Sequence, residues 1–151
     1  MYESHDAMHV CETGCLHYQL MDTRWCATYA RQLAAGNRDD IRRVEGDITG
    51  MDTHVGLAPT SPGRIRITII DIDPDTALRA DLSVPVLVVE VGTPNGPSPV
   101  VIDGWDQIYR ARCEGRQTLP TIALGPETEL QCRVHCPQRE HRAWRGLLRF
   151  H

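Results

Sequence analysis

The sequence predicts an α+β fold, in which a small mixed sheet packs against helices. Two observations support this prediction. Between residues 64 and 130, runs of β-branched residues alternate with short segments that carry helix-start and helix-stop signals. The chain has 151 residues, 41% of them hydrophobic, and 12 glycines, which is the size and composition of a globular domain rather than of a disordered or fibrous chain. We therefore expect one core with smaller segments on either side.

The first segment, residues 1–63, is predicted to be a helical extension followed by a linker. Asp22 can cap a helix that ends at Gly36-Asn37. The apolar residues of this helix recur at i, i+3 and i+4 spacing, and they are Trp25, Cys26, Tyr29, Ala30 and Leu33. From residue 37 to Gly63, charged residues, glycines and prolines predominate, so we expect loops or short helical turns and a domain boundary near Gly63.

The core, residues 64–130, is predicted to begin with a strand, because polar and apolar residues alternate over 64–72. Asp73 can then act as N-cap with Pro74 at the first helical position, which predicts a short helix over 74–80. The later elements are predicted as strands at 84–91, 100–102 and 119–124, a turn at 93–97, a helix at 105–114 and one helical turn at 126–130.

The last segment, residues 131–151, is predicted to be a basic amphipathic helix that packs on the core. It carries five arginines and one acid, whereas residues 1–63 and 64–130 each carry a net charge of -4. A helix that starts at Pro137 places three arginines opposite its apolar arc, and these are Arg142, Arg145 and Arg149. They are candidates for contact with nucleic-acid phosphates or an acidic partner, although a solvated face is the simpler interpretation.

The most informative motif is the corner between the strand at 100–102 and the helix that follows it. A glycine turn there precedes the unpaired N–H groups of a helix N-terminus, and such a corner favours an anion. The candidate ligand-binding residues are Asp103, Gly104, Trp105, Asp106, Gln107 and Arg110. A tight turn with an N-cap, which needs no ligand, is the alternative interpretation.

This corner resembles the ParB/sulfiredoxin superfamily, whose small α+β domains carry a strand followed by Asp-Gly-x-His-Arg, then an alanine, a glycine and a Leu-Pro strand. The matching residues are Asp103, Gly104, Ala111, Gly115, Leu119 and Pro120, and the resemblance covers roughly residues 64–130. It implies a ParB/sulfiredoxin-like fold that binds a nucleotide, a nucleic acid or a protein partner. Where the family pattern has His and Arg, this chain has Asp106 and Gln107, so a strong phosphate contact is missing.

We therefore expect a noncatalytic binding module of the ParB/sulfiredoxin-like kind. The alternative is an enzyme on the same scaffold that acts on a nucleotide or phosphorylated substrate, with Asp103 or Asp106 as acid/base or metal ligand. The cysteine nucleophile that sulfiredoxin-like chemistry needs beside the family's His-Arg pair is absent, because Trp105 and Asp106 lie there. The sequence identifies no cofactor.

Six cysteines, at positions 11, 15, 26, 113, 132 and 136, raise a third alternative, a zinc-stapled protein-interaction domain. The pairs Cys11/Cys15 and Cys132/Cys136 have a spacing that structural zinc sites allow, and His17 and His135 could add ligands. This hypothesis requires the two ends of the chain to meet. Free cysteines that act as small buried hydrophobic residues are the simpler interpretation.

No stretch approaches the roughly 20 apolar residues that span a bilayer. The first 20 residues carry acids and no basic residue before an apolar run, which is not typical of a secretory signal. We therefore expect a cytoplasmic protein with no membrane contact. Arginine supplies all 16 basic residues, and this usage suggests a bacterial genome of high GC content.

Overall fold

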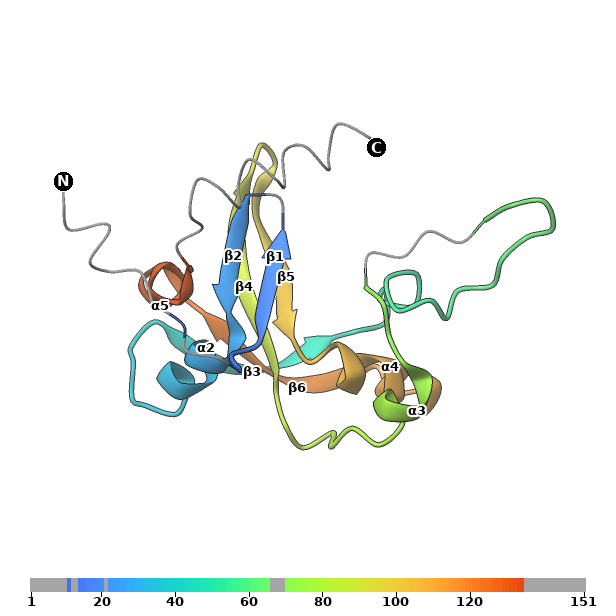
Figure 1. Cartoon of the computed structure of the whole chain (residues 1–151), viewed down its shortest axis with the longest axis horizontal. Coiled ribbons are helices and arrows are strands. Elements are labelled where there is room, and N and C mark those ends of the chain that lie inside the picture. Colours follow the sequence, from blue (N-terminus) through green and yellow to red (C-terminus); the bar gives the residue numbers. More distant parts are fainter. Residues whose placement is uncertain (1–10, 12–13, 21, 66–69, 135–151) are drawn as a thin grey trace.

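The computed structural model describes residues 11, 14–20, 22–65 and 70–134, which form two sheets and four helices (Figure 1). The strands are β1 (His17–Leu20), β2 (Thr23–Cys26), β3 (Ile41–Asp47), β4 (Val86–Thr93), β5 (Gly96–Asp103) and β6 (Thr118–Leu124). The helices are α2 (Ala27–Ala34), α3 (Pro74–Ala77), α4 (Trp105–Cys113) and α5 (Pro126–Cys132). The prediction of an α+β structure is confirmed.

The larger sheet has four strands in the order β3-β6-β4-β5. β4 and β5 form an antiparallel hairpin, β6 runs parallel to β4, and β3 pairs antiparallel with β6 at the edge. The smaller sheet is the antiparallel hairpin β1-β2, which lies alongside β5 (Figure 1). Figure 1 also shows α2 and α5 at one side of the larger sheet and α3 and α4 at the other.

One face of the larger sheet packs against other elements over much of β4, β5 and β6, and we call it the covered face. Its residues alternate along the strands and are Leu87, Val89, Ile102, Ile122 and Leu124. They pack against Trp25 of β2, Ala30 and Ala34 of α2, and Cys132 of α5. Residues from both sides of Gly63 therefore contribute to one core, and β3 shares a sheet with strands of the 64–130 segment.

The opposite face of the same sheet, which we call the open face, is covered at one end only. At that end Val86 and Leu119 pack against Ile108 and Ala111 of α4. Toward the other end the side chains are less protected, and Val44 of β3 is 46% exposed. The open face is thus a partly exposed apolar surface.

Several predicted elements are confirmed. Asp73 lies at the N-cap of α3 with Pro74 in its first turn, although the helix ends at Ala77. The turn after β4 joins it to β5 as an antiparallel hairpin, and α4 and β6 begin and end within a residue of the predicted bounds. These elements carry local signals, because proline, glycine and capping residues restrict the backbone whatever surrounds them.

The predicted helix after Asp22 is correct only from Ala27 onward. Trp25 lies on β2, where it pairs with Tyr18 of β1. Cys26 is the N-cap of α2, and its sulfur accepts a hydrogen bond from the backbone N–H of Tyr29. Pairing in a hairpin thus decides the conformation of two residues whose apolar spacing also suits a helix.

Two further predictions need correction. Strand β3 lies within the segment 37–63, which we predicted to be loops or helical turns. Its sequence is polar because most of it is exposed at the sheet edge, so it lacks an apolar strand signal. Conversely, the described residues of the predicted strand at 64–72 are not in a strand, and residues 66–69 lie outside the described residues.

The segment after β6 forms a longer helix than the single predicted turn. Asp40, just before β3, caps α5, because its carboxylate accepts hydrogen bonds from the N–H and hydroxyl of Thr128 at 2.8 and 2.6 Å. The predicted helix from Pro137 lies outside the described residues. Among the helices that are described, none has the length and apolarity that crossing a bilayer requires.

Candidate ligand-binding site

The predicted corner forms as a tight turn between β5 and α4. Gly104 adopts a φ of +107°, and a Cβ there would lie 3.0 Å from the Cα of Val86, so the turn requires glycine both for its conformation and for space. The Asp103 carboxylate accepts hydrogen bonds from the Gly104 N–H at 3.0 Å and from Arg31 Nε of α2 at 2.7 Å. Asp103 therefore joins the corner to α2.

A cavity of about 400 Å³, the corner cavity, brings most of the predicted ligand-binding residues together. The predicted residues that line it are Asp103, Gly104, Trp105, Asp106 and Gln107. The N-terminal hairpin supplies His17 and Tyr18 to the same cavity, and Asp71 lies at its wall. Carboxylates thus outnumber cations in the lining, which disfavours an anion at this helix N-terminus.

Arg110 does not join this cavity. Its Nε donates to Glu114 Oε2 at 2.8 Å, and its guanidinium also donates to the carbonyl oxygen of Ala80. Arg110 therefore links α4 to the segment after α3, and it does not line the corner cavity with the other predicted residues. None of the residues that line the corner cavity is an arginine. The lining therefore has no counterpart to the arginine of the Asp-Gly-x-His-Arg pattern.

A second cavity, of about 530 Å³, lies over the open face and is largely apolar; we call it the open-face cavity. Its floor is made by side chains from all four strands of the larger sheet, among them Val44, Val86, Val88, Val101, Thr121 and Ala123. Its end wall is formed by Met51 and His54 of the loop after β3 and by Trp105 and Ile108 of α4. This size and lining are typical of small-molecule pockets.

Two ring nitrogens in this end wall are buried and lack a partner among the described residues: His54 Nδ1 and Trp105 Nε1. The two rings are stacked, with their centroids 6.4 Å apart and an angle of 28° between their planes. The indole N–H can only donate, whereas His54 Nδ1 can donate or accept. Buried polar groups are almost always hydrogen-bonded in folded proteins, so two such nitrogens side by side are unusual.

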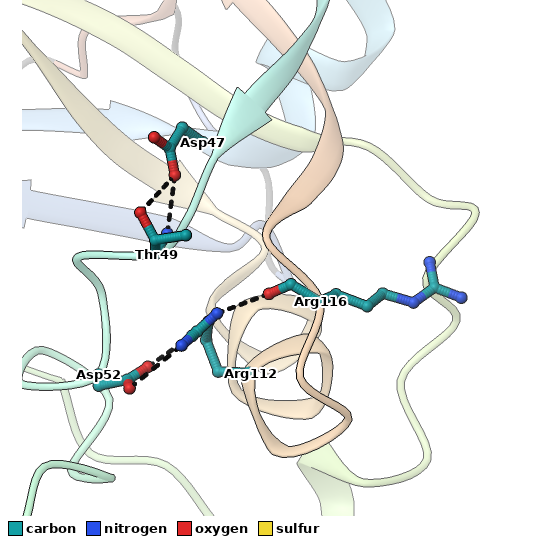
Figure 2. Close-up of polar contacts among 5 residues, drawn as sticks. All are labelled: Asp47, Thr49, Asp52, Arg112 and Arg116. Atoms are coloured by element: carbon teal, nitrogen blue, oxygen red, sulfur yellow. Dashed lines mark hydrogen bonds and ion pairs between the residues drawn. The ribbon is translucent and has the colours of Figure 1, made fainter.

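A polar network fixes the loop that carries Met51 and His54 (Figure 2). Arg112 of α4 forms a bidentate ion pair with Asp52, in which Nε donates to Oδ1 at 2.6 Å and Nη2 donates to Oδ2 at 3.3 Å. The same guanidinium donates to the backbone oxygen of Arg116 at 2.7 Å. Because Asp52 lies between Met51 and His54 in the chain, this ion pair fixes the loop to α4.

The beginning of this loop is fixed in a similar way. Asp47, at the end of β3, accepts hydrogen bonds from the hydroxyl and the N–H of Thr49 at 2.7 and 2.9 Å (Figure 2). These hydrogen bonds, with the Arg112 charge nearby, hold the pKa of Asp47 below its usual value. At pH 7 the carboxylate is charged, and the turn that leads into the end wall is stabilised.

The far rim of the open-face cavity is polar. Arg42 of β3 and Glu90 of β4 form an ion pair at 3.6 Å, and both side chains are more than half exposed. Charge on this rim is therefore balanced. A neutral molecule fits such a lining better than a phosphate does.

Sequence reasoning found only Trp105 among the residues of the end wall. His54 and Met51 lie in the segment predicted to be a linker, and no local pattern distinguishes them there. The residues of β3 offer one usable signal, because alternate residues 42, 44 and 46 face the cavity with the period of a strand.

The other predicted functional residues are placed as follows. Cys11 and Cys15 lie together, and Cys26, which we did not predict as a ligand, lies with them. Residues 133 and 134 run beside β2, through a bridge between Trp25 and Arg133. The predicted meeting of Cys11 and Cys15 with both Cys132 and Cys136 stays a prediction. Cys136, His135, Arg142, Arg145 and Arg149 lie outside the described residues.

Comparisons with protein-family models, with curated proteins and with solved structures found no match to this chain. The functional interpretation therefore depends on the residues and cavities described above.

Proposed function

We propose that this protein is a noncatalytic binding module whose ligand is a small, neutral heteroaromatic molecule, such as a nucleobase or nucleoside, bound in the open-face cavity. The observation that carries the proposal is a largely apolar cavity of about 530 Å³ whose end wall contains the stacked aromatic rings of His54 and Trp105. The flat body of such a ligand would lie on the apolar floor and pack against these rings.

The charge around both cavities supports a neutral ligand over a phosphorylated one. The corner cavity is lined by Asp71, Asp103 and Asp106, and the guanidinium of Arg31, which lies outside the lining, is paired with Asp103. On the open face, Arg42 is paired with Glu90. A phosphate group would thus meet carboxylates without a free guanidinium in the described lining of either cavity.

The test is a thermal-shift screen of the full chain against the four common nucleosides and their di- and triphosphates. A nucleoside at about a hundred times its dissociation constant should stabilise the protein by roughly 2.7 kcal/mol, which corresponds to a shift of roughly 5–10 °C for a chain of this size. Trp105→Phe reduces the aromatic surface of the end wall, so it should weaken binding, and His54→Ala should do the same. Asp106→Ala, which changes only the corner cavity, is the matched control.

The outcomes separate the two cavities. Loss of the shift in Trp105→Phe and His54→Ala, with the Asp106→Ala variant unchanged, supports the open-face cavity. If Asp106→Ala instead removes the shift and His54→Ala retains it, the ligand binds at the corner. No shift with any nucleoside or nucleotide would contradict the proposal.

The enzyme remains a second candidate because of one observation. Asp106 lines the corner cavity together with Asp71 and His17, so a carboxylate there has other titratable groups nearby. Incubation with nucleoside triphosphates followed by measurement of released phosphate tests this candidate. Turnover that Asp106→Asn abolishes and His54→Ala preserves would support the enzyme over the binding module.

A further inference from the structure

Three cysteines from two separate segments meet at the start of α2. Cys11 and Cys15 come from the segment before β1, and Cys26 ends β2 and caps α2. Their sulfur atoms all lie within 4.8 Å of one another. In a tetrahedral zinc site with Zn–S bonds of about 2.3 Å, sulfur atoms are roughly 3.8 Å apart, so only a small inward movement separates this cluster from that geometry.

A fourth donor lies next to the cluster. His17, the first residue of β1, places its Nε2 2.9 Å from the sulfur of Cys11. Cys26 is buried, Cys11 and Cys15 are half-buried, and His17 is exposed, so the site lies just beneath the surface, where an ion can enter. Three cysteines and one histidine are a common ligand set of structural zinc sites.

The local backbone favours these positions. Gly14, between Cys11 and Cys15, has a φ of +96°, which allows the chain to turn sharply between the two thiols. The sulfur of Cys26 accepts a hydrogen bond from the Tyr29 N–H at 3.3 Å, at the N-terminus of α2. This hydrogen bond holds the sulfur of Cys26 in place at the start of the helix.

Without a cation, the cluster opposes ionisation of its own thiols. Three thiolates this close together would repel one another. A divalent cation would compensate for this repulsion and for the partial burial of the site.

We propose that Cys11, Cys15, Cys26 and His17 together bind one Zn²⁺ ion. Binding forms three Zn–S bonds and one Zn–N bond, and the three thiol protons pass to solvent, so no oxidant or reductant is needed. All four positions are then filled by the protein, which makes the site structural rather than catalytic. The ion would fasten the segment 11–17 to the start of α2, beside the corner cavity that His17 also lines.

This ligand set differs from the one that cysteine spacing alone indicates. Cys132 is buried in the core that α5 shares with Trp25, and burial is the main reason that its pKa rises to about 12. The charge of Cys26 contributes to the same rise, so Cys132 lies near the cluster and is the competing candidate for the fourth position. A disulfide between two of the three clustered cysteines is the chemical alternative to a metal.

The test is metal analysis of the full chain, purified with a thiol reductant and without added metal. We expect about one zinc per chain in the wild type and a loss of nearly all of it in Cys11→Ser and in Cys15→Ser. These two residues are only half-buried, so their variants should still fold, which circular dichroism checks. Cys113→Ser is the matched control, because Cys113 is exposed on α4 and should leave the zinc content unchanged.

Cobalt substitution identifies the fourth ligand. Tetrahedral Co²⁺ bound by thiolates absorbs visible light, and His17→Gln should change this spectrum and weaken the affinity at least tenfold, whereas Cys132→Ser should leave both unchanged. A spectrum that responds to Cys132→Ser and not to His17→Gln overturns the assignment of His17. Reduced wild-type protein that binds neither metal, or a disulfide among Cys11, Cys15 and Cys26 in rapidly alkylated cell extract, overturns the zinc site itself.

Discussion

The two faces of the larger sheet are built from similarly apolar strands but lie in different surroundings. On β4, Leu87 and Val89 are completely buried on the covered face, whereas their neighbour Val88 on the open face is only partly buried. The covered face packs against β2, α2 and α5, whereas α4, the loop after β3 and the segments on either side of α3 close one end of the open face. One face therefore forms the main core, and the other leaves a largely apolar cavity.

The closed end of the open face is where a single substitution should have the largest effect. Gly104→Ala would place a side chain on a left-handed backbone, and the added Cβ would lie 3.0 Å from the Cα of Val86. Because both effects destabilise the folded state, we expect the unfolding free energy to fall by about 3 kcal/mol. Gly96→Ala is the matched control, because Gly96 has nearly the same φ and no atom within 4 Å of its added Cβ. Urea denaturation of both variants measures the difference, and equal losses would mean that the contact with Val86 has no cost.

The middle of β4 gives the most direct comparison of the two faces. Val89→Ala should lower the unfolding free energy by about 2 kcal/mol, because it leaves a space in the fully buried core. Val88→Ala, one residue earlier, should cost less than about 1 kcal/mol and enlarge the open-face cavity. Chemical denaturation of the two variants decides the point. If Val88→Ala were as costly as Val89→Ala, the open face would be as tightly packed as the covered face.

The ion pair that fixes the end wall should make stability depend on pH. The Arg112 guanidinium holds the pKa of Asp52 below its usual value. A lowered pKa stabilises the folded state above the unfolded-state pKa of about 3.9, and this stabilisation disappears as the pH falls through the lower folded-state value. The wild type should therefore be modestly more stable than Asp52→Asn at pH 7, and the difference should shrink as the pH falls below about 4.

Thermal denaturation between pH 7 and pH 3 measures this convergence. Asp39→Asn removes an exposed carboxylate elsewhere on the surface and serves as the control. A constant difference between the wild type and Asp52→Asn over the whole pH range would show that the charge of Asp52 does not stabilise the loop.

The smallest effect is expected at the rim of the open face. Arg42 and Glu90 are 69% and 52% exposed and are separated by 3.6 Å, so solvent screens their attraction strongly. Arg42→Ala should change the unfolding free energy by less than about 0.5 kcal/mol, and added salt should reduce even that difference. Denaturation at low and high ionic strength checks both statements. A loss above 1 kcal/mol would indicate that Arg42 also supports the floor of the cavity by packing.

Much of the fold could be predicted where a local signal restricts the backbone. Asp73-Pro74 starts α3, the turn after β4 forms its hairpin, and Asp103-Gly104 forms the corner before α4. Of the candidate site, the sequence indicated the corner residues and Trp105. The resemblance to the ParB/sulfiredoxin superfamily stays a prediction, as does the basic face with Arg142, Arg145 and Arg149.

The sequence by itself determined which residues turn, cap and alternate, because those preferences depend on a few neighbouring dihedral angles and hydrogen bonds. Only the tertiary structure decided that polar β3 completes the sheet, that His54 faces Trp105, and that Cys26 joins Cys11 and Cys15. These outcomes arise from contacts between segments far apart in the chain. Local patterns carry no record of such contacts, because the free energy that selects them comes from packing whole elements together.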